Sequence, residues 1–144
     1  MTRFLLLLAL VFGVASCASV DVARYADQQP ALNLEHFFSQ PVKAWGMFQK
    51  RSGEVAKRFE VNIVSRHEGN NLILYERFVY SDGTRQRRVW TLTPEGQGRW
   101  SGRADDVVGV AKGQVAGYTL HWRYRLNLPV GDSTYEMSMD DWMY

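Results

Sequence analysis

The sequence predicts an all-β protein whose strands form one antiparallel, up-and-down meander. From residue 41 onward, turn residues recur about every 13 to 18 positions and leave segments of strand length between them. Within these segments apolar and polar residues alternate with a period of two, as a sheet with one covered and one wet face requires. No helical pattern of ten or more residues interrupts the series.

Residues 1–16 have the composition of a bacterial signal peptide. Met1–Arg3 is a short basic head, and Phe4–Ala15 is an apolar run. A helix made of this run is roughly 18 Å long, too short for the roughly 30 Å hydrocarbon core of a bilayer. The segment Val14–Cys17 resembles the lipobox of bacterial lipoproteins, which implies cleavage before Cys17 and acylation of that cysteine. A plain signal peptide followed by a chance cysteine is the alternative.

The residue after the cysteine predicts the destination. Lipoproteins kept in the inner membrane often carry Asp at this position, whereas this chain has Ala18. We therefore expect an anchor in the outer membrane of a Gram-negative cell, with the globular part in the periplasm. Acyl chains on Cys17 would hold the protein stably at the membrane.

Residues 17–36 are expected to form the lipidated cysteine and a polar tether, and residues 37–144 a β-barrel domain. The tether prediction depends on the polar segment Ala18–Pro30, which ends in a proline. The next segment, Ala31–Gln40, has enough apolar residues for one short helical turn packed on the domain: Leu32, Leu34, Phe37 and Phe38.

The strands follow from the alternation. The longest alternating segment runs from Tyr118 to Leu128, and shorter ones cover Phe59–Ile63 and Tyr135–Met139. Asp82-Gly83 is the strongest hairpin signal, because glycine readily adopts the positive φ of a tight turn. Seven strands are expected, near 42–50, 54–66, 71–81, 84–93, 98–111, 117–128 and 133–143.

Long strands joined by short hairpins close most readily into an up-and-down barrel. A small barrel that encloses one ligand usually has about eight strands, one more than the alternation indicates. Either two strands are merged near Gly109, or the chain ends before the barrel is complete.

Composition and charge weigh against several classes of function. Removal of residues 1–16 leaves a net charge of +1, which gives little attraction for nucleic acid. The single cysteine cannot form an internal disulfide. The histidines have no metal-ligand spacing, and the sequence has no phosphate loop, dinucleotide fingerprint or nucleophile elbow. Neither a metal nor a cofactor is expected.

Tryptophans and arginines supply the candidate ligand-binding residues. Trp45, Trp90 and Trp122 are candidates for lining the barrel mouth, although bulky aromatic residues more often fill a core. Arg87 is the candidate for holding an anionic group of the ligand, because a guanidinium matches carboxylate and phosphate geometry. Arg88 is expected on the same face as Trp90. Alternatively, the arginines fix the strand register by pairing with Asp105, Asp106 or Glu76.

An enzyme is the third hypothesis. The members of Asp105-Asp106 and of Asp140-Asp141 point to opposite faces of a strand, so neither pair is a catalytic unit by itself. A hydrolase-like site would need two of Asp106, His121 and Asp141 to converge in one cleft with perturbed pKa values.

Five short segments carry a family resemblance: Lys43–Gly46, Arg51–Gly53, Gln86–Trp90, Ala104–Gly109 and Asp141–Tyr144. In this order they resemble domain-of-unknown-function family 3833, a bacterial lipoprotein family, over essentially the whole chain. The resemblance implies a lipobox and a lipocalin-like strand pattern. Relatives continue past the last segment by a strand or two, which implies a barrel that lacks its closing strand and exposes an edge.

Taken together, these features favour an outer-membrane lipoprotein that binds a small amphipathic or lipid-like ligand without catalysis. The alternative is a module that docks another envelope protein through an exposed sheet edge.

Overall fold

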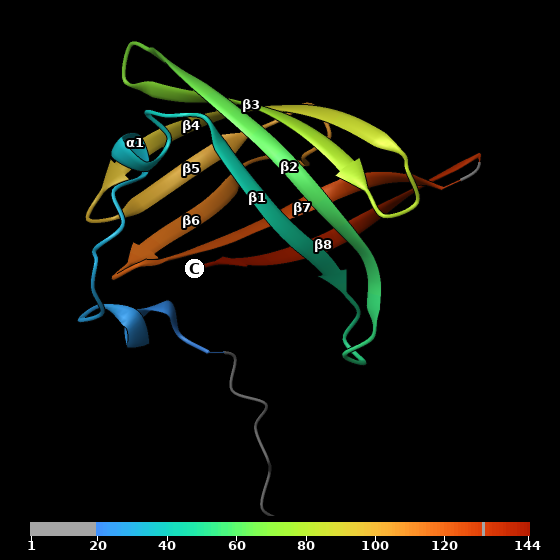
Figure 1. The fold of residues 1–144 in the computed structure, drawn as a ribbon, viewed down its shortest axis with the longest axis horizontal. Helices are drawn as coiled ribbons and strands as arrows, with labels where there is room; N and C mark the ends of the chain where they lie inside the picture. The colour runs from blue at the N-terminus through green and yellow to red at the C-terminus, as the bar shows by residue number, and fades with distance from the viewer. Residues whose placement is uncertain (1–19, 131) are drawn as a thin grey trace, which may run out of the picture.

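The computed structural model describes residues 20–130 and 132–144, which form one antiparallel sheet of eight strands. Each strand pairs with the next in the sequence, and the sheet curls into a half-barrel (Figure 1). The predicted all-β meander is confirmed, as a lipocalin-like barrel without closure. The expected signal peptide and Cys17 lie outside the described residues. The strands are β1 (Val42–Gln49), β2 (Val55–Glu68), β3 (Asn71–Tyr80), β4 (Arg85–Gly96), β5 (Arg99–Arg103), β6 (Ala111–Ala116), β7 (Thr119–Val130) and β8 (Ser133–Met143).

The predicted strand 98–111 is in fact two elements. It contains β5 and the first residue of β6, with a loop over residues 104–110 between them. The loop begins beside Asp105 and Asp106, residue types that are depleted in strands, and Gly109 has a φ of 74° that breaks extended backbone. Of the two explanations for the missing eighth strand, the merged pair of strands is therefore correct.

The hairpin predicted at Asp82-Gly83 joins β3 to β4. The Tyr80 amide donates to the Thr84 carbonyl at 2.9 Å, and Gly83 has a φ of 82°. The Asp82 carboxylate accepts hydrogen bonds from the backbone and the side chain of Thr84, so this turn is fixed by its own sequence.

The inner face of the sheet carries the core. The alternation predicted along β7 is confirmed: Leu120, Trp122, Tyr124 and Leu126 are buried, and the residues between them are more exposed. Residues of β2 to β5 extend the buried cluster, which includes Val61, Ile63, Leu72, Leu74, Phe78, Trp90, Leu92 and Trp100.

Trp122 of β7 covers two glycines, Gly113 of the neighbouring β6 and Gly102 of β5 beyond it. A Cβ atom on Gly113 would be 2.1 Å from Cε3 of the Trp122 ring, and one on Gly102 would be 2.5 Å from its Cζ2. Real Cβ atoms do not approach a ring so closely. These positions are therefore restricted to glycine by the indole that covers them.

The segment before β1 is folded onto the barrel. A 3₁₀ turn, η1 (Val22–Tyr25), contacts β6 and β7 and buries Val22. The short helix α1 (Leu34–Phe37) is the helical turn expected within 31–40, and it adds Leu34 and the adjacent Phe38 to the core. Two residues of the segment expected as a tether, Val22 and Leu34, are thus buried against the domain.

Candidate functional site

Two of the four predicted ligand-binding residues lie on the outer face of the sheet. Trp45 is 70% exposed and is paired in register with Glu60 of β2. Arg87 is exposed and lies opposite Arg77 of β3. Neither side chain lines the interior, because the period of two directs them away from the core face.

The other two predicted residues lie inside the half-barrel. Trp90 and Trp122 are each 5% exposed, and their rings meet edge to face with centroids 5.6 Å apart. Tyr124 contacts Trp90 in the same geometry at 5.4 Å. These rings form an aromatic wall on the inner surface, defined here as Trp90, Trp122 and Tyr124.

The arginine on the inner face is Arg88, not Arg87. Its guanidinium binds the Asp106 carboxylate through Nη2 at 2.8 Å and Nε at 3.0 Å from Oδ2. The Arg88 side chain is 9% exposed and that of Asp106 is 27% exposed. Gln86 also donates to Asp106, and Tyr80 donates to Gln86. Of the partners weighed for the arginines, Asp106 is the one that Arg88 binds, and it lies in a loop and not in a strand.

The loop between β5 and β6 places Asp106 over the inner face. The Asp106 carbonyl accepts a hydrogen bond from the Asn127 amide at 2.9 Å, and the Val108 amide donates to the Arg125 carbonyl at 2.9 Å. Val107 forms an isolated bridge with Leu126. The loop is thereby held against β7, and its carboxylate reaches Arg88 on β4.

Two further carboxyl groups lie near this ion pair. Glu76 of β3 is directly opposite Arg88 in the sheet register. Asp141 of β8 accepts a hydrogen bond from the Tyr124 hydroxyl at 3.0 Å. We call Glu76, Arg88, Asp106, Tyr124 and Asp141 the interior polar cluster.

Burial governs the protonation of this cluster. It raises the pKa of the Glu76 carboxyl to about 7, against the opposing effects of the Arg88 charge and the Trp90 side chain. Burial also raises the pKa of Asp141, although the Tyr124 hydrogen bond and Arg88 act in the opposite direction. Burial and the nearby Asp141 charge raise the pKa of the Tyr124 hydroxyl. Perturbed groups gathered in this way are typical of functional sites.

Sequence reasoning weighed Glu76 only as a partner for an arginine and gave Tyr124 no functional role. The signal that could have identified Glu76 is its place in the alternation of β3, where it shares the core face with Leu74 and Phe78. A charged residue at a core position of a strand is unusual and indicates a buried polar site.

The three residues of the enzyme hypothesis are divided between the two faces. Asp106 and Asp141 both lie near Arg88, whereas His121 lies on the other face of β7. The His121 ring stacks on the Trp142 ring with centroids 4.0 Å apart, and its Nε2 forms a hydrogen bond with the Asp140 carboxylate. The His121 ring thus lies on the face opposite the cluster, although its charge still acts on the pKa of Asp141.

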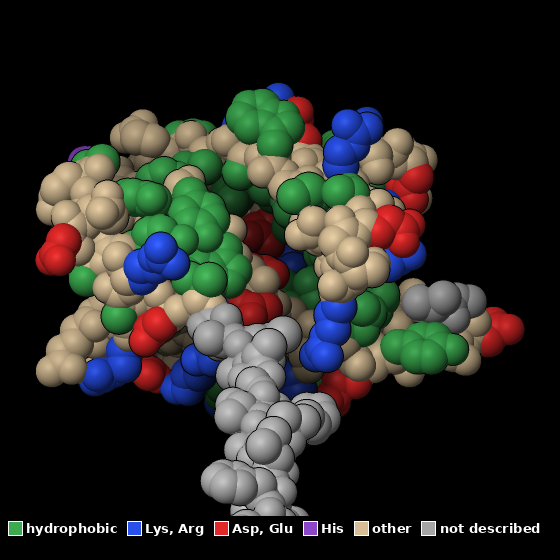
Figure 2. All heavy atoms as spheres, turned by 90° about the horizontal axis from the view of Figure 1, so that it is seen from below, with side chains coloured by type: hydrophobic (Ala, Val, Ile, Leu, Met, Phe, Trp, Pro, Cys, Tyr) green, Lys and Arg blue, Asp and Glu red, His purple; other side chains and the backbone are tan. Residues whose placement is uncertain are grey.

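The molecule is hollowed on the face shown in Figure 2, where acidic side chains are visible deep between two masses of apolar residues. The partial exposure of Asp106 shows that solvent reaches the interior polar cluster. None of the four predicted ligand-binding residues lines either of the two cavities described next.

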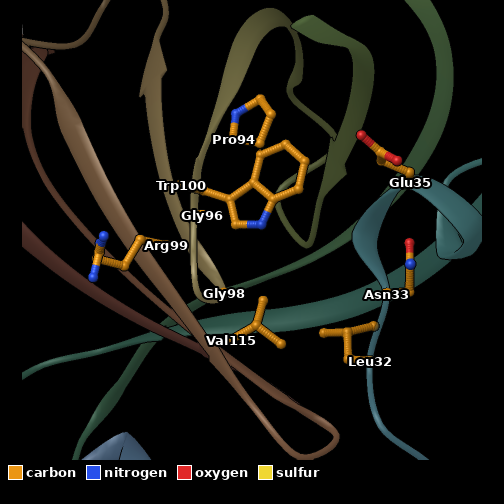
Figure 3. Close-up of a pocket in the computed structure, with 9 residues that line it drawn as sticks. All are labelled: Leu32, Asn33, Glu35, Pro94, Gly96, Gly98, Arg99, Trp100 and Val115. Atoms are coloured by element: carbon orange, nitrogen blue, oxygen red, sulfur yellow. The ribbon is translucent and has the colours of Figure 1, made fainter. Parts of the chain in front are cut away.

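A cavity of about 270 Å³ lies where the α1 segment meets β4, β5 and β6. Trp100 occupies its centre between Pro94 and the α1 segment, and the Arg99 side chain points away from Glu35 (Figure 3). A second cavity, of about 560 Å³, lies under η1 and is lined by Val22, Gln114 and Gly117 among others. Both are shallow features at the margin of the barrel and lack a cluster of charged groups.

Within residues 20–130 and 132–144, no group of three His, Cys, Asp or Glu side chains is arranged to hold a metal ion. In the same part of the chain, no helix is sufficiently long and apolar to cross a lipid bilayer.

The fold and the interior define the class of this protein: an open, up-and-down β half-barrel with an aromatic wall and a buried polar cluster on its concave face. The chain belongs to the family described as "Protein of unknown function (DUF3833)", whose profile matches residues 11–144. No curated protein and no solved structure matches the chain.

The raised pKa of Glu76 predicts a stability that depends on pH. The folded protein holds the Glu76 proton more tightly than the unfolded chain, whose pKa is near the ordinary 4.5. Stability is therefore lost as the pH rises from about 4.5 through 7. We expect Glu76→Gln to be more stable than the parent by about 2–3 kcal/mol at pH 8 and by less than about 1 kcal/mol at pH 5.

Urea unfolding of both proteins at several pH values measures this difference. Glu60→Gln is the matched control, because Glu60 lies on the outer face and Lys43 lowers its pKa. Near neutral pH the Glu60→Gln protein is expected to be less stable than the parent, whereas Glu76→Gln is expected to be more stable. A Glu76→Gln protein whose advantage does not grow between pH 5 and pH 8 would contradict the prediction.

Proposed function

We propose that this protein is a lipid-anchored protein of the bacterial envelope that binds a small amphipathic molecule in the hollow of its half-barrel, without catalysis. The observation that carries the proposal is the composition of the inner surface. An aromatic wall that includes Trp90 and Trp122 lies beside the polar groups of Arg88, Asp106 and Glu76. Ligand sites are typically apolar surfaces with a few convergent polar groups.

The interior polar cluster does not favour the stability of the fold. Buried polar atoms are nearly always hydrogen-bonded, yet Oε2 of Glu76 is buried without a partner among residues 20–130 and 132–144. An apolar side chain at this strand position would avoid the cost of burying a carboxyl group. A ligand that supplies the missing partner accounts for the presence of the carboxyl.

The anchor is proposed from the lipobox-like segment ending at Cys17. Val22, five residues further along, is buried against the barrel. Five extended residues span roughly 18 Å at most, so an acylated Cys17 would keep the domain close to the membrane surface. Such a position suits a protein that takes up a molecule with an apolar part.

The test is the native mass of the full-length protein purified from its membrane in mild detergent. An added mass on the acylated chain that is lost on denaturation is expected, and its identity gives the ligand. Cys17→Ala is the control for the anchor, because that variant should lose both the acyl mass and the membrane association. A native mass equal to the acylated chain alone, together with no binding of added alkyl ligands, would overturn the proposal.

A second candidate is docking of another envelope protein at the edge of the sheet. β1 pairs with β2, and among the described residues it pairs with no other strand. Its outer face presents Trp45 and Met47, which are 70% and 54% exposed. A polypeptide that co-purifies after cross-linking, with loss of the cross-link in Trp45→Ser and an empty barrel, would favour this candidate.

A further inference from the structure

The Glu76 carboxyl is the group in the half-barrel that most clearly requires a partner. Its Oε2 is buried and has no hydrogen-bond partner within the part of the chain that the structure describes. The other polar atoms around it are engaged with one another: Arg88 binds Asp106 through two nitrogens, and the Tyr124 hydroxyl donates to Asp141. The Trp90 side chain hydrogen-bonds the Glu76 carboxyl, and a partner for the remaining oxygen, Oε2, would come from outside this network.

The charges around Glu76 indicate which kind of partner fits. The ionisable groups that face it are Arg88 of β4, Asp106 of the loop between β5 and β6, Tyr124 of β7, Asp141 of β8 and Tyr80 of its own strand. Lys57 of β2 lies farther toward the rim, where it is paired with Asp82. When ionised, three carboxylates thus share one guanidinium, and that guanidinium is committed to Asp106.

An anionic ligand would meet this surplus of carboxylates, and it would have to displace Asp106 from Arg88. A cation would instead balance the charge of Glu76 and Asp141. The sequence predicts that an arginine, Arg87, binds an anionic group of the ligand. The charges of the interior polar cluster instead favour a cationic group.

The aromatic residues beside Glu76 suit a cation as well. Trp90 and Tyr124 are adjacent to the cluster, and Phe78 lies on the same strand face as Glu76. Arg88 already lies over the rings of Phe78 and Trp90, at 5.6 Å and 5.9 Å from their centroids. Aromatic faces next to a carboxylate are a recognised way to bind alkylammonium groups.

We propose that Glu76, supported by Asp141 and the aromatic wall, binds the cationic ammonium head of an amphipathic ligand. This inference rests on the proposed function and specifies the class of ligand. The apolar chain of the ligand would lie along the apolar part of the inner surface, and its head would supply the partner that Glu76 lacks.

The test compares three probes of equal chain length by isothermal titration calorimetry: decylammonium, decyl sulfate and 1-decanol, each below its aggregation limit. Decylammonium carries N–H groups that can donate to Oε2 of Glu76, and we expect it to bind at least about tenfold more tightly than the other two at pH 8, as one buried charge pair predicts. Because a primary alkylammonium stays charged from pH 6 to pH 8, its affinity should rise about tenfold over this range as Glu76 ionises.

Glu76→Gln keeps the size of the side chain and removes its charge. In this variant we expect the rise with pH to be lost, and the cation should bind no more tightly than 1-decanol. Asp141→Asn separates the contribution of the second carboxyl, and Glu60→Gln on the outer face is the matched control. Urea unfolding of each variant shows that it is folded.

Three outcomes distinguish this inference from the proposed function. Equal binding of all three probes, or a preference for decyl sulfate, would overturn the cation site and leave the amphipathic ligand standing. Binding of none of them would overturn both. Equal binding of methylammonium, which has the head without the chain, and of decylammonium would show a site for the head alone and would overturn the amphipathic ligand.

Discussion

Replacing Arg88 with methionine is expected to destabilise the protein by about 2–4 kcal/mol, since it leaves a partly buried carboxylate without its cation. The Arg88 side chain is 9% exposed and binds Asp106 through two nitrogens. Methionine retains most of the volume, so the loss reports mainly on charge. The Asp106 carboxylate, at 27% exposed, keeps some contact with water, which moderates the cost.

The adjacent residue supplies the control. Arg87→Met changes the same side chain one position away, on the outer face, where substitutions usually alter stability by less than about 0.5 kcal/mol. The double variant Arg88→Met/Asp106→Leu should recover part of the loss, because it removes the unpaired charge as well. Urea unfolding followed by circular dichroism measures all of these. Equal effects of Arg87→Met and Arg88→Met would show that the pair does not support the fold.

Replacing Trp122 with alanine is expected to cost about 3–5 kcal/mol, the range for removing a large aromatic side chain from a core. The ring covers Gly102 and Gly113 at distances that exclude even a methyl group, and it meets Trp90 edge to face. Neighbouring glycines have no side chains that could move to fill the space. The cavity should therefore remain largely open.

Trp45→Ala is the matched control, since it removes the same side chain from a site that is 70% exposed. A change of less than about 0.5 kcal/mol is expected there. Circular dichroism is the appropriate probe, because the substitutions alter tryptophan fluorescence directly. A loss of less than about 1 kcal/mol in Trp122→Ala would mean that the inner surface is loosely packed, and Trp122 would then be a better candidate for ligand contact than for the core.

The local pattern of the sequence was sufficient to predict the class of fold. Alternation along Tyr118–Leu128 and the Asp82-Gly83 turn are short-range features, because a strand's side chains alternate strictly and a tight turn depends on its own few residues. The division of 98–111 into β5 and β6 was one of two explanations that the sequence left open for the missing strand. The loop between them is held by hydrogen bonds to β7, and a contact of that kind has no local signature that decides between the two.

The candidate site shows the same division. The sequence by itself determined that Arg88 shares a face with Trp90 and that Arg87 does not, because the period of two fixes the relative sides of one strand. It did not determine whether Trp45 faces the interior or the solvent, because the sequence of β1 alone does not show which of its two faces is covered. Only the curling of the sheet brought Glu76, Arg88, Asp106 and Asp141 together from β3, β4, a loop and β8. Burial depends on what the other strands cover, and the protonation of Glu76 depends on burial, so both were decided by the tertiary structure.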